Sequence, residues 1–288
     1  MGKNSHWIGK SENGKTVTLH KFDAEFKTAA YANASWLDLN HDLVRTAVVL
    51  DTETTGMNRG NDKIIEIGIR SFKFNRNTGD ILTICDSYSG LEDPGVPLSE
   101  TITLVTGLTD ADLKDQKIDW KKVSDIIETA DIVIAHNASF DRPFVEKKCD
   151  TSKKKIWGCS VKQVDWLKRG YSSGKLELLS IYHGFFTDAH RALNDADALL
   201  HVLSHGYLKE LLDNARRPQV RLAALNSPFE TKDALKERGY YWDTEGRYWK
   251  KVIFKDQADE EIRWMTDAIY KGSFKGTCLD IPLNDSFK

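Results

Sequence analysis

Four carboxylates and one histidine stand where predicted strands end or predicted helices begin: Asp51, Glu53, Asp141, His190 and Asp195. Each has an ordinary explanation by itself, since acidic residues are common in turns and favourable at helix N-termini. Together the carboxylates are too many to be buried in one place without counter-charge. Oxygen ligands suit hard cations such as Mg²⁺ or Mn²⁺, whereas zinc prefers more histidine or cysteine. The set therefore indicates a site for hard cations.

Such a site points to phosphodiester chemistry. Two hard cations about 3.5–4 Å apart form the clamp used for in-line phosphodiester displacement. One ion generates the attacking hydroxide, and the other stabilises the leaving 3′ oxygen. A histidine is the natural general base for the attacking water.

The elements that carry the first carboxylates are predicted from apolar runs. Residues 47–50 form a continuous apolar run, which is typical of a strand buried on both faces. Asp51 and Glu53 end this strand, and its period of two directs both side chains to the same side. Strand-like runs at 64–74 and 80–88 follow across an Asn-Thr-Gly turn and predict a meander.

The remaining candidates depend on a second strand and two helices. Residues 131–135 predict another buried strand, and Asp141 lies in the first turn of the helix after it. His190 is expected in a loop before a helix over 191–207 because five residues correspond to about 140° of helical rotation. Asp195 then lies on the first or second turn. A meander followed by alternating strands and helices predicts an α/β fold with a mixed sheet.

The motifs at these positions resemble a known family. VVLDTETTG followed by IIEIG, then HNASFDRPF, then HRALNDADALL resembles the three exonuclease motifs of the DEDD superfamily, histidine branch. This family includes the proofreading subunit of bacterial DNA polymerase III and ribonuclease T. The resemblance covers about residues 46–207, including CSVKQ and KLELLSIYHGF between the second and third motifs. It implies a ribonuclease H-like fold and a 3′–5′ exonuclease that releases nucleoside 5′-monophosphates.

The resemblance also implies roles for individual residues. The metal ligands, for two Mg²⁺ or Mn²⁺ ions per active site, would be Asp51, Glu53, Asp141 and Asp195. Asp51 would bridge both ions, Asp141 would act largely through water, and His190 would be the general base. The pocket for the terminal nucleotide would be lined by Thr54, Thr55, Gly56, Met57, Asn137 and Phe140. Met57 resembles the family's apolar wedge against the last bases.

The chain changes character after residue 214. Residues 216–255 hold ten lysines and arginines against five aspartates and glutamates, with interleaved aromatic residues. The segment LNSPFETKDALKERGYYWDTEGRYWKK resembles a small module appended to bacterial exonucleases and other DNA-processing proteins. Basic and aromatic side chains on one small surface suit single-stranded nucleic acid. Alternatively, Trp242 and Trp249 form the core of a small domain, which leaves as surface candidates Lys232, Lys236, Arg247 and Lys250.

These observations predict three parts of the chain. Residues 1–45 form an N-terminal extension with a hairpin at Asn13-Gly14 and a helix over 23–36, without visible chemistry. Residues 46–212 form the exonuclease domain. Residues 213–288 form a small α+β accessory domain with basic and aromatic side chains.

Composition agrees with an intracellular globular protein. The 288 residues are 40% hydrophobic and 29% charged, and the formal net charge of −2 gives no global basic field. No apolar stretch is long enough for a membrane span, and the polar N-terminus does not resemble a secretory signal. Four scattered cysteines without CxxC pairing make a zinc knuckle or a disulfide framework improbable. A reducing cytoplasm is the expected compartment.

Three alternatives stay open. Residues 170–174 match G-x-S-x-G, the serine hydrolase elbow, although the preceding residues 161–169 look helical where that elbow needs a strand. A non-catalytic module that holds nucleic acid or a polymerase is the second alternative. The third is an exoribonuclease, because no residue can be assigned to reading the 2′-hydroxyl group. The accessory module favours DNA, and a polymerase or another DNA-processing protein is a possible partner.

Overall fold

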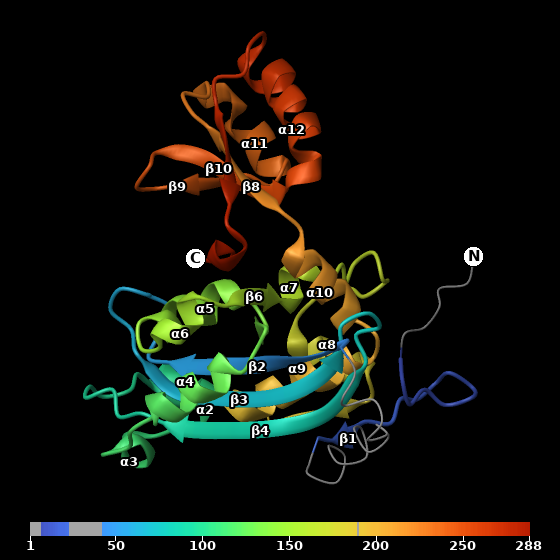
Figure 1. Cartoon of the computed structure of the whole chain (residues 1–288), viewed down its shortest axis with the longest axis vertical. Coiled ribbons are helices and arrows are strands. Elements are labelled where there is room, and N and C mark those ends of the chain that lie inside the picture. Colours follow the sequence, from blue (N-terminus) through green and yellow to red (C-terminus); the bar gives the residue numbers. More distant parts are fainter. Residues whose placement is uncertain (1–6, 23–41, 189) are drawn as a thin grey trace. The chain divides into compact units, whose positions relative to one another are not determined.

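The computed structural model describes residues 7–22, 42–188 and 190–288 (Figure 1). The chain divides into two compact units, the first comprising residues 1–215 with 287–288 and the second residues 216–286. Residues 7–22 belong to the first unit. The expected hairpin has an antiparallel bridge between Lys10 and Val17. The helix expected over 23–36 lies outside the described residues.

The first unit is built on a five-stranded mixed sheet in the order β4-β3-β2-β5-β6 (Figure 1). Strands β2, β3 and β4 form the antiparallel meander, and β5 and β6 run parallel to β2. The strands are β2 (Val44–Thr54), β3 (Ile64–Asn75), β4 (Ile81–Leu91), β5 (Ile132–Ala135) and β6 (Ile156–Cys159). This sheet confirms the predicted α/β fold with a mixed, ribonuclease H-like sheet.

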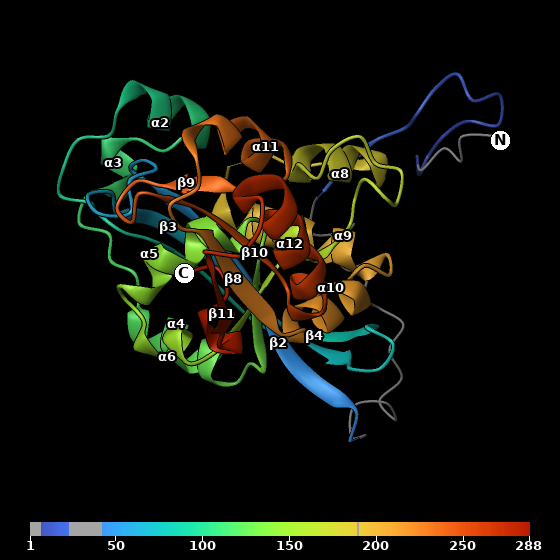
Figure 2. The same ribbon diagram turned by 90° about the horizontal axis from the view of Figure 1, so that it is seen from above.

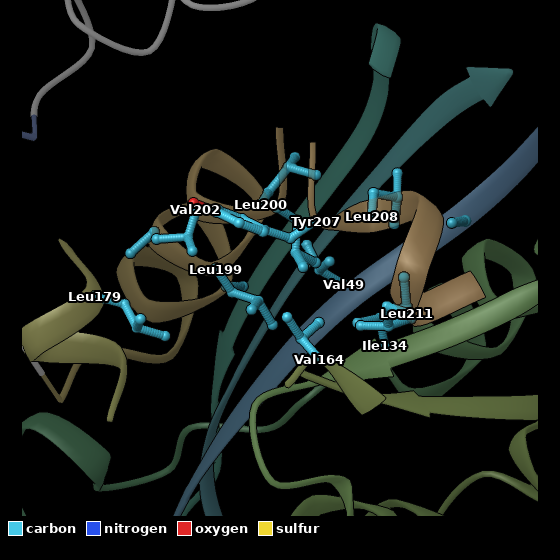
Figure 3. Close-up of a cluster of buried hydrophobic side chains, with 14 of the residues drawn as sticks. Val49, Ile134, Val164, Leu179, Leu199, Leu200, Val202, Tyr207, Leu208 and Leu211 are labelled. Atoms are coloured by element: carbon cyan, nitrogen blue, oxygen red, sulfur yellow. The ribbon is translucent and has the colours of Figure 1, made fainter. Parts of the chain in front are cut away.

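Helices cover both faces of the sheet, which explains the continuous apolar run over residues 47–50 in the middle of β2. Val49 faces a cluster with α8 (Leu176–Tyr182), α9 (Ala192–Ser204) and α10 (Leu208–Arg216), shown in Figure 3. Val48 faces the opposite cluster with α4 (Trp120–Glu128) and α5 (Ala138–Glu146). Both valines are fully buried. Strands of this kind lose the polar alternation that a half-exposed strand would show.

Short elements complete the first unit. They are β1 (His20–Lys21), α2 (Glu100–Thr106), α3 (Asp110–Leu113), α6 (Asp150–Lys153), α7 (Ser160–Gln163) and β7 (Phe185–Phe186). The helix expected over 161–169 ends at Gln163, since the indole of Trp166 is buried and donates to the Ser160 carbonyl at 2.9 Å. Turns, and not a strand, therefore precede Gly170, so residues 170–174 lack the context of a hydrolase elbow.

The second unit is an antiparallel sheet with helices packed on one face (Figure 2). Its strands, in the order β11-β8-β10-β9, are β8 (Gln219–Ala224), β9 (Tyr241–Asp243), β10 (Tyr248–Phe254) and β11 (Thr277–Ile281). Its helices are α11 (Lys232–Glu237) and α12 (Ala258–Trp264), the latter continuing as a π-helical segment, Met265–Tyr270. Its small core includes Leu222, Leu235 and Met265. Among the residues described in either unit, no helix is both long and apolar enough to cross a membrane.

Candidate active site

The first two carboxylates lie at the end of β2, the middle strand of the five-stranded sheet. Asp51 pairs with Gly68 of β3, and Glu53 pairs with Glu66. The period of two places Asp51 and Glu53 on one face of the strand, as expected. Both side chains are partly exposed, so this end of β2 opens from the buried core toward solvent.

Gly68 brings the start of α9 against this part of the sheet. A Cβ atom at Gly68 would lie 2.1 Å from the backbone nitrogen of Leu193, a distance that no side chain tolerates. The missing side chain therefore allows the backbone of α9 to touch β3. This contact carries Asp195, in the first turn of α9, to the end of β2.

His190 and Asp195 meet Glu53 at this point. One ligand atom from each of these three residues lies within 4.8 Å of the others. His190 precedes α9 in a left-handed conformation, with φ of 62°, and its backbone N–H donates to Asp195 Oδ2 at 2.9 Å. The imidazole is exposed, so it can exchange protons with solvent.

Asp141 approaches from the opposite side, on the first turn of α5. Its Oδ1 accepts hydrogen bonds from the backbone N–H of Thr52 at 3.0 Å and from the Thr52 hydroxyl at 2.8 Å. The side chain is only 2% exposed. These bonds fix one carboxylate oxygen and tie α5 to β2 between Asp51 and Glu53.

Burial raises the pKa of every carboxyl in the predicted set, and the charges of neighbouring acids add to this effect at Asp51, Glu53 and Asp195. The pKa of Asp51 lies well above its usual range because of burial first and then the charges of Asp141, Asp195 and other acids. Burial is also the largest cause for Glu53, whose pKa rises to about 8, and for Asp141, whose pKa rises to about 7. The pKa of Asp195 rises to about 6. Divalent cations would relieve this repulsion, and the oxygen-rich donor set fits Mg²⁺ or Mn²⁺.

Sequence reasoning missed a fifth acid, Glu66. Its side chain is 1% exposed and accepts from the Arg191 guanidinium at 3.1–3.2 Å and from the Ala192 backbone N–H at 3.3 Å. Glu66 thereby binds β3 to the residue that follows His190. The available signal was a charged residue inside the apolar run IIEIG, because a buried charge is retained only with a partner.

Four of the residues predicted to line the nucleotide pocket lie at the end of β2 and in the loop after it. The hydroxyl of Thr54 donates to the Gly56 carbonyl at 2.6 Å, and that of Thr55 donates to Asp62 Oδ1 at 2.9 Å. Both hydroxyl groups therefore shape the loop. A Cβ atom at Gly56 would lie 2.6 Å from Asp62 Oδ2, so a larger residue there would displace the carboxylate that holds Thr55. Met57 is 79% exposed at the end of this turn.

Asn137 and Phe140 lie at the start of α5, beside the carboxylates. Asn137 is the N-cap residue, in a left-handed conformation with φ of 76°, and its side chain accepts from the Ser139 hydroxyl at 2.8 Å. Phe140 packs against Phe144 with ring centroids 5.2 Å apart and remains partly exposed. The guanidinium of Arg59 donates to the Ser139 carbonyl at 2.7 Å, which links the loop after β2 to α5.

In the second unit the four predicted lysines and arginines separate into two groups. Lys232 lies over the ring of Phe229 at 4.3 Å, and Lys236 lies over Trp249 at 5.8 Å. Lys250 lies over the Tyr241 ring at 5.4 Å and pairs with Asp243 at 2.6 Å, and Arg247 occupies the hairpin turn with φ of 55°.

The two tryptophans of this unit differ in burial. Trp249 packs against the small core, whereas Trp242 is 46% exposed and contacts Trp249 edge-on at 5.6 Å. Trp242 is therefore not a core residue. The alternative that both tryptophans form the core of a small domain therefore applies only to Trp249.

Comparison with known proteins assigns the family. The sequence profile of the RNase_T exonuclease family matches residues 48–203, more than half of the chain. DNA polymerase III PolC-type from Caldanaerobacter subterraneus subsp. tengcongensis is 30% identical over 157 residues, covering 52% of this chain and 11% of that protein. The enzyme of the same name from Bacillus subtilis is 34% identical over 185 residues, covering 60% and 12%. The matched region thus spans about a tenth of the length of these relatives.

A solved structure shares the fold. Escherichia coli exonuclease I, in complex with a dT13 oligonucleotide, aligns with a TM-score of 0.51 at 13% identity, over 73% of this chain and 63% of the other. At this identity the likeness concerns the fold alone. The profile match over residues 48–203 carries the assignment. The chain belongs to the RNase_T exonuclease family, in the DEDD superfamily of 3′–5′ exonucleases.

Proposed function

We propose that this 3′–5′ exonuclease belongs to the histidine branch and hydrolyses DNA from single-stranded 3′ ends, releasing nucleoside 5′-monophosphates. The observation that carries the proposal is the meeting of Glu53, His190 and Asp195 within 4.8 Å, beside two further carboxylates. A histidine next to a cluster of hard oxygen ligands supports metal-dependent hydrolysis with a protein general base.

Two Mg²⁺ or Mn²⁺ ions would be held by four carboxylates: Asp51, Glu53, Asp141 and Asp195. Asp51 lies among the charges of Asp141, Asp195 and Glu53, and it would contact both ions, as the family resemblance implies. When bound, the ions supply Lewis acidity to the scissile phosphate and to the attacking water. The ring of His190 takes the proton of that water and, being exposed, passes it to solvent.

The loop after β2 and the start of α5 would form the nucleotide pocket. Thr54, Thr55 and Gly56 hold the loop through the hydrogen bonds and the close approach described above. Met57, 79% exposed, would pack against the last base. Asn137 and Phe140 would shape the opposite wall from α5.

The second unit would bind the single strand. We define the basic-aromatic strip as a run of side chains linked by the cation-π and ring contacts reported above: Phe229, Lys232, Lys236, Trp242 and Trp249. Lys232 and Lys236 are four residues apart on α11 and so share one side of it. Exposed rings beside cations suit stacked bases and phosphates. Lys250 and Arg247 lie off this strip and would contribute less.

The cellular setting is part of the proposal. The four cysteines are free, which supports a reducing compartment such as the cytoplasm. The similarity to PolC-type DNA polymerase III supports DNA as the substrate and a polymerase as a possible partner.

A time course on 5′-labelled single-stranded DNA and RNA of the same sequence tests the proposal. Each strand is incubated with Mg²⁺, Mn²⁺ or EDTA, beside the Asp51→Ala protein. We expect a metal-dependent ladder that shortens from the 3′ end, faster on DNA and absent in the variant. Faster degradation of RNA would support the exoribonuclease alternative. Binding of either strand without degradation in any metal would support a non-catalytic module.

A further inference from the structure

The N-terminal segment 7–22 lies along the chain that leads to His190. The backbone N–H of Ile8 donates to the Tyr182 carbonyl at 2.9 Å, at the end of α8. Further along, the N–H of His20 donates to the Gly184 carbonyl at 2.9 Å, and that of Phe22 to the Phe186 carbonyl at 2.8 Å. Strand β1 thus pairs in parallel with β7.

Side chains of the same segment reinforce this pairing. Phe22 is 7% exposed, and its ring lies 4.9 Å from that of Phe185 and 5.4 Å from His201 on α9. Lys21 pairs with Asp188 at 2.8 Å. Asp188 is two residues before His190, and its carbonyl accepts from the Asn194 amide of α9 at 3.4 Å.

Strand β7 pairs with β1 in a two-stranded sheet. Among the described strands, β1 is its sole neighbour in the sheet. A two-residue strand is not stable alone, and a two-stranded pair needs packing against other elements. Phe22 and Phe185 supply that packing by joining the buried cluster under α9. The anchored end of β7 leads directly into the loop that carries His190.

The conformation of His190 makes such support necessary. Its φ of 62° lies in the left-handed region, which is unfavourable for a residue that has a side chain. Such a conformation persists only where the surrounding structure holds it. The hydrogen bond to Asp195 fixes the loop on its C-terminal side. The N-terminal side is fixed by β7 and, through β7, by β1.

We infer that residues 7–22 form a positioning element for the catalytic histidine, with Phe22 and Lys21 as its positioning residues. The inference rests on the proposed function and extends it to a segment outside the matched family region, residues 48–203. Loss of either contact would leave the carboxylates in place and let the imidazole depart from the attacking water. A misplacement of about 1 Å can reduce a rate by about 10²-fold.

Phe22→Leu and its matched control Phe74→Leu test the inference in the full chain. Phe74 is also buried in the cluster under α9, but it lies at the far end of β3 from Glu66. Both variants should lower the melting temperature. On a short single-stranded DNA we expect Phe22→Leu to lower kcat about tenfold or more with KM unchanged, by loss of general-base alignment. Phe74→Leu should retain the kcat of the parent protein.

Lys21 provides a second, milder test. Lys21→Met should lower kcat with KM unchanged, and Lys21→Arg should restore it, because arginine can also reach Asp188. Equal kcat values for Phe22→Leu and Phe74→Leu, together with full activity of Lys21→Met, would overturn the inference while the exonuclease proposal stands. An inactive parent protein would overturn the proposed function and this inference with it.

Discussion

At the scale of single residues, the acids of the active site oppose folding in the absence of cations. Asp51 is surrounded by the carboxylates of Asp141, Asp195, Glu53 and Glu66, and burial raises its pKa. We expect Asp51→Asn to abolish turnover and to stabilise the metal-free protein, because the change removes one member of a cluster of like charges. Thermal melting in EDTA measures this effect. An unchanged or lower melting temperature would contradict it.

The raised pKa values, which arise chiefly from burial, also predict how stability depends on pH. Glu53, with a pKa of about 8, and Asp141, with a pKa of about 7, bind protons more tightly in the folded protein than in the unfolded chain. Below the pKa values of about 4 that these groups have in the unfolded chain, both states are protonated and stability does not depend on them. As the pH rises from there to the pKa values of the folded protein, the unfolded chain releases its protons first, and the folded state loses stability. In EDTA, the melting temperature should therefore fall between pH 5 and 8. Saturating Mg²⁺ should reduce that slope, and a slope insensitive to Mg²⁺ would contradict the metal site.

His190 should affect rate and leave the fold intact. His190→Ala removes the general base from a loop and no buried contact, so we expect kcat to fall by about 10²–10⁴-fold. His205→Ala is the matched control, since His205 is another exposed histidine, at the opposite end of α9. Mn²⁺ binding measured by calorimetry should persist in both variants. Comparable activity of the two proteins would remove His190 from the mechanism.

At the scale of elements, the site depends on how closely α9 approaches β3. Gly68→Ala would place a Cβ atom 2.1 Å from the Leu193 nitrogen, so the helix must move. We expect a loss of at least about 1–3 kcal/mol, the usual cost of overpacking, together with loss of activity as Asp195 leaves Glu53. Gly60→Ala is the control, because the nearest atom there is the end of the Asn58 side chain at 3.1 Å. Denaturant unfolding and the DNA assay measure the two effects.

The sequence was most informative where a residue's role follows from local geometry. The alternation in β2 and the position of Asp195 after a loop follow from strand and helix periods, and the structure has both. Contacts between distant segments do not follow from such periods. Glu66 was missed because its partner, Arg191, is 125 residues away. The pairing of β1 with β7 likewise joins segments that neither composition nor spacing connects.

Tertiary packing also overrode local preference. Residues 161–169 have a helical pattern, yet α7 ends at Gln163 because Trp166 turns into the core. The exposure of Trp242 could not be decided from its type, since a tryptophan in a small domain is expected in the core. Trp242 is exposed because it lies on β9, an edge strand of the sheet.

At the scale of the whole molecule, the division into two units predicts that chemistry and strand capture can be separated by mutation. The active site lies wholly within the first unit, and the basic-aromatic strip lies wholly within the second. Variants of the strip should therefore change affinity for long strands and leave kcat on a short substrate unchanged. Variants of the active site should do the reverse.

Trp242→Ala tests this separation, with Tyr241→Ala as its matched control. The two residues are adjacent on β9 and similarly exposed, at 46% and 51%, but their side chains point to opposite faces of the sheet. We expect Trp242→Ala to weaken binding of a long single strand by about 1–3 kcal/mol, the value of one stacked base. Tyr241→Ala should have no such effect. If each lysine neutralises one phosphate of the single strand, Lys232→Ala and Lys236→Ala should each reduce the salt dependence of binding by about 0.7 in the log–log slope. If Tyr241→Ala weakened binding and Trp242→Ala did not, the strand would bind the opposite face of this sheet, where Lys250 lies over the Tyr241 ring at 5.4 Å.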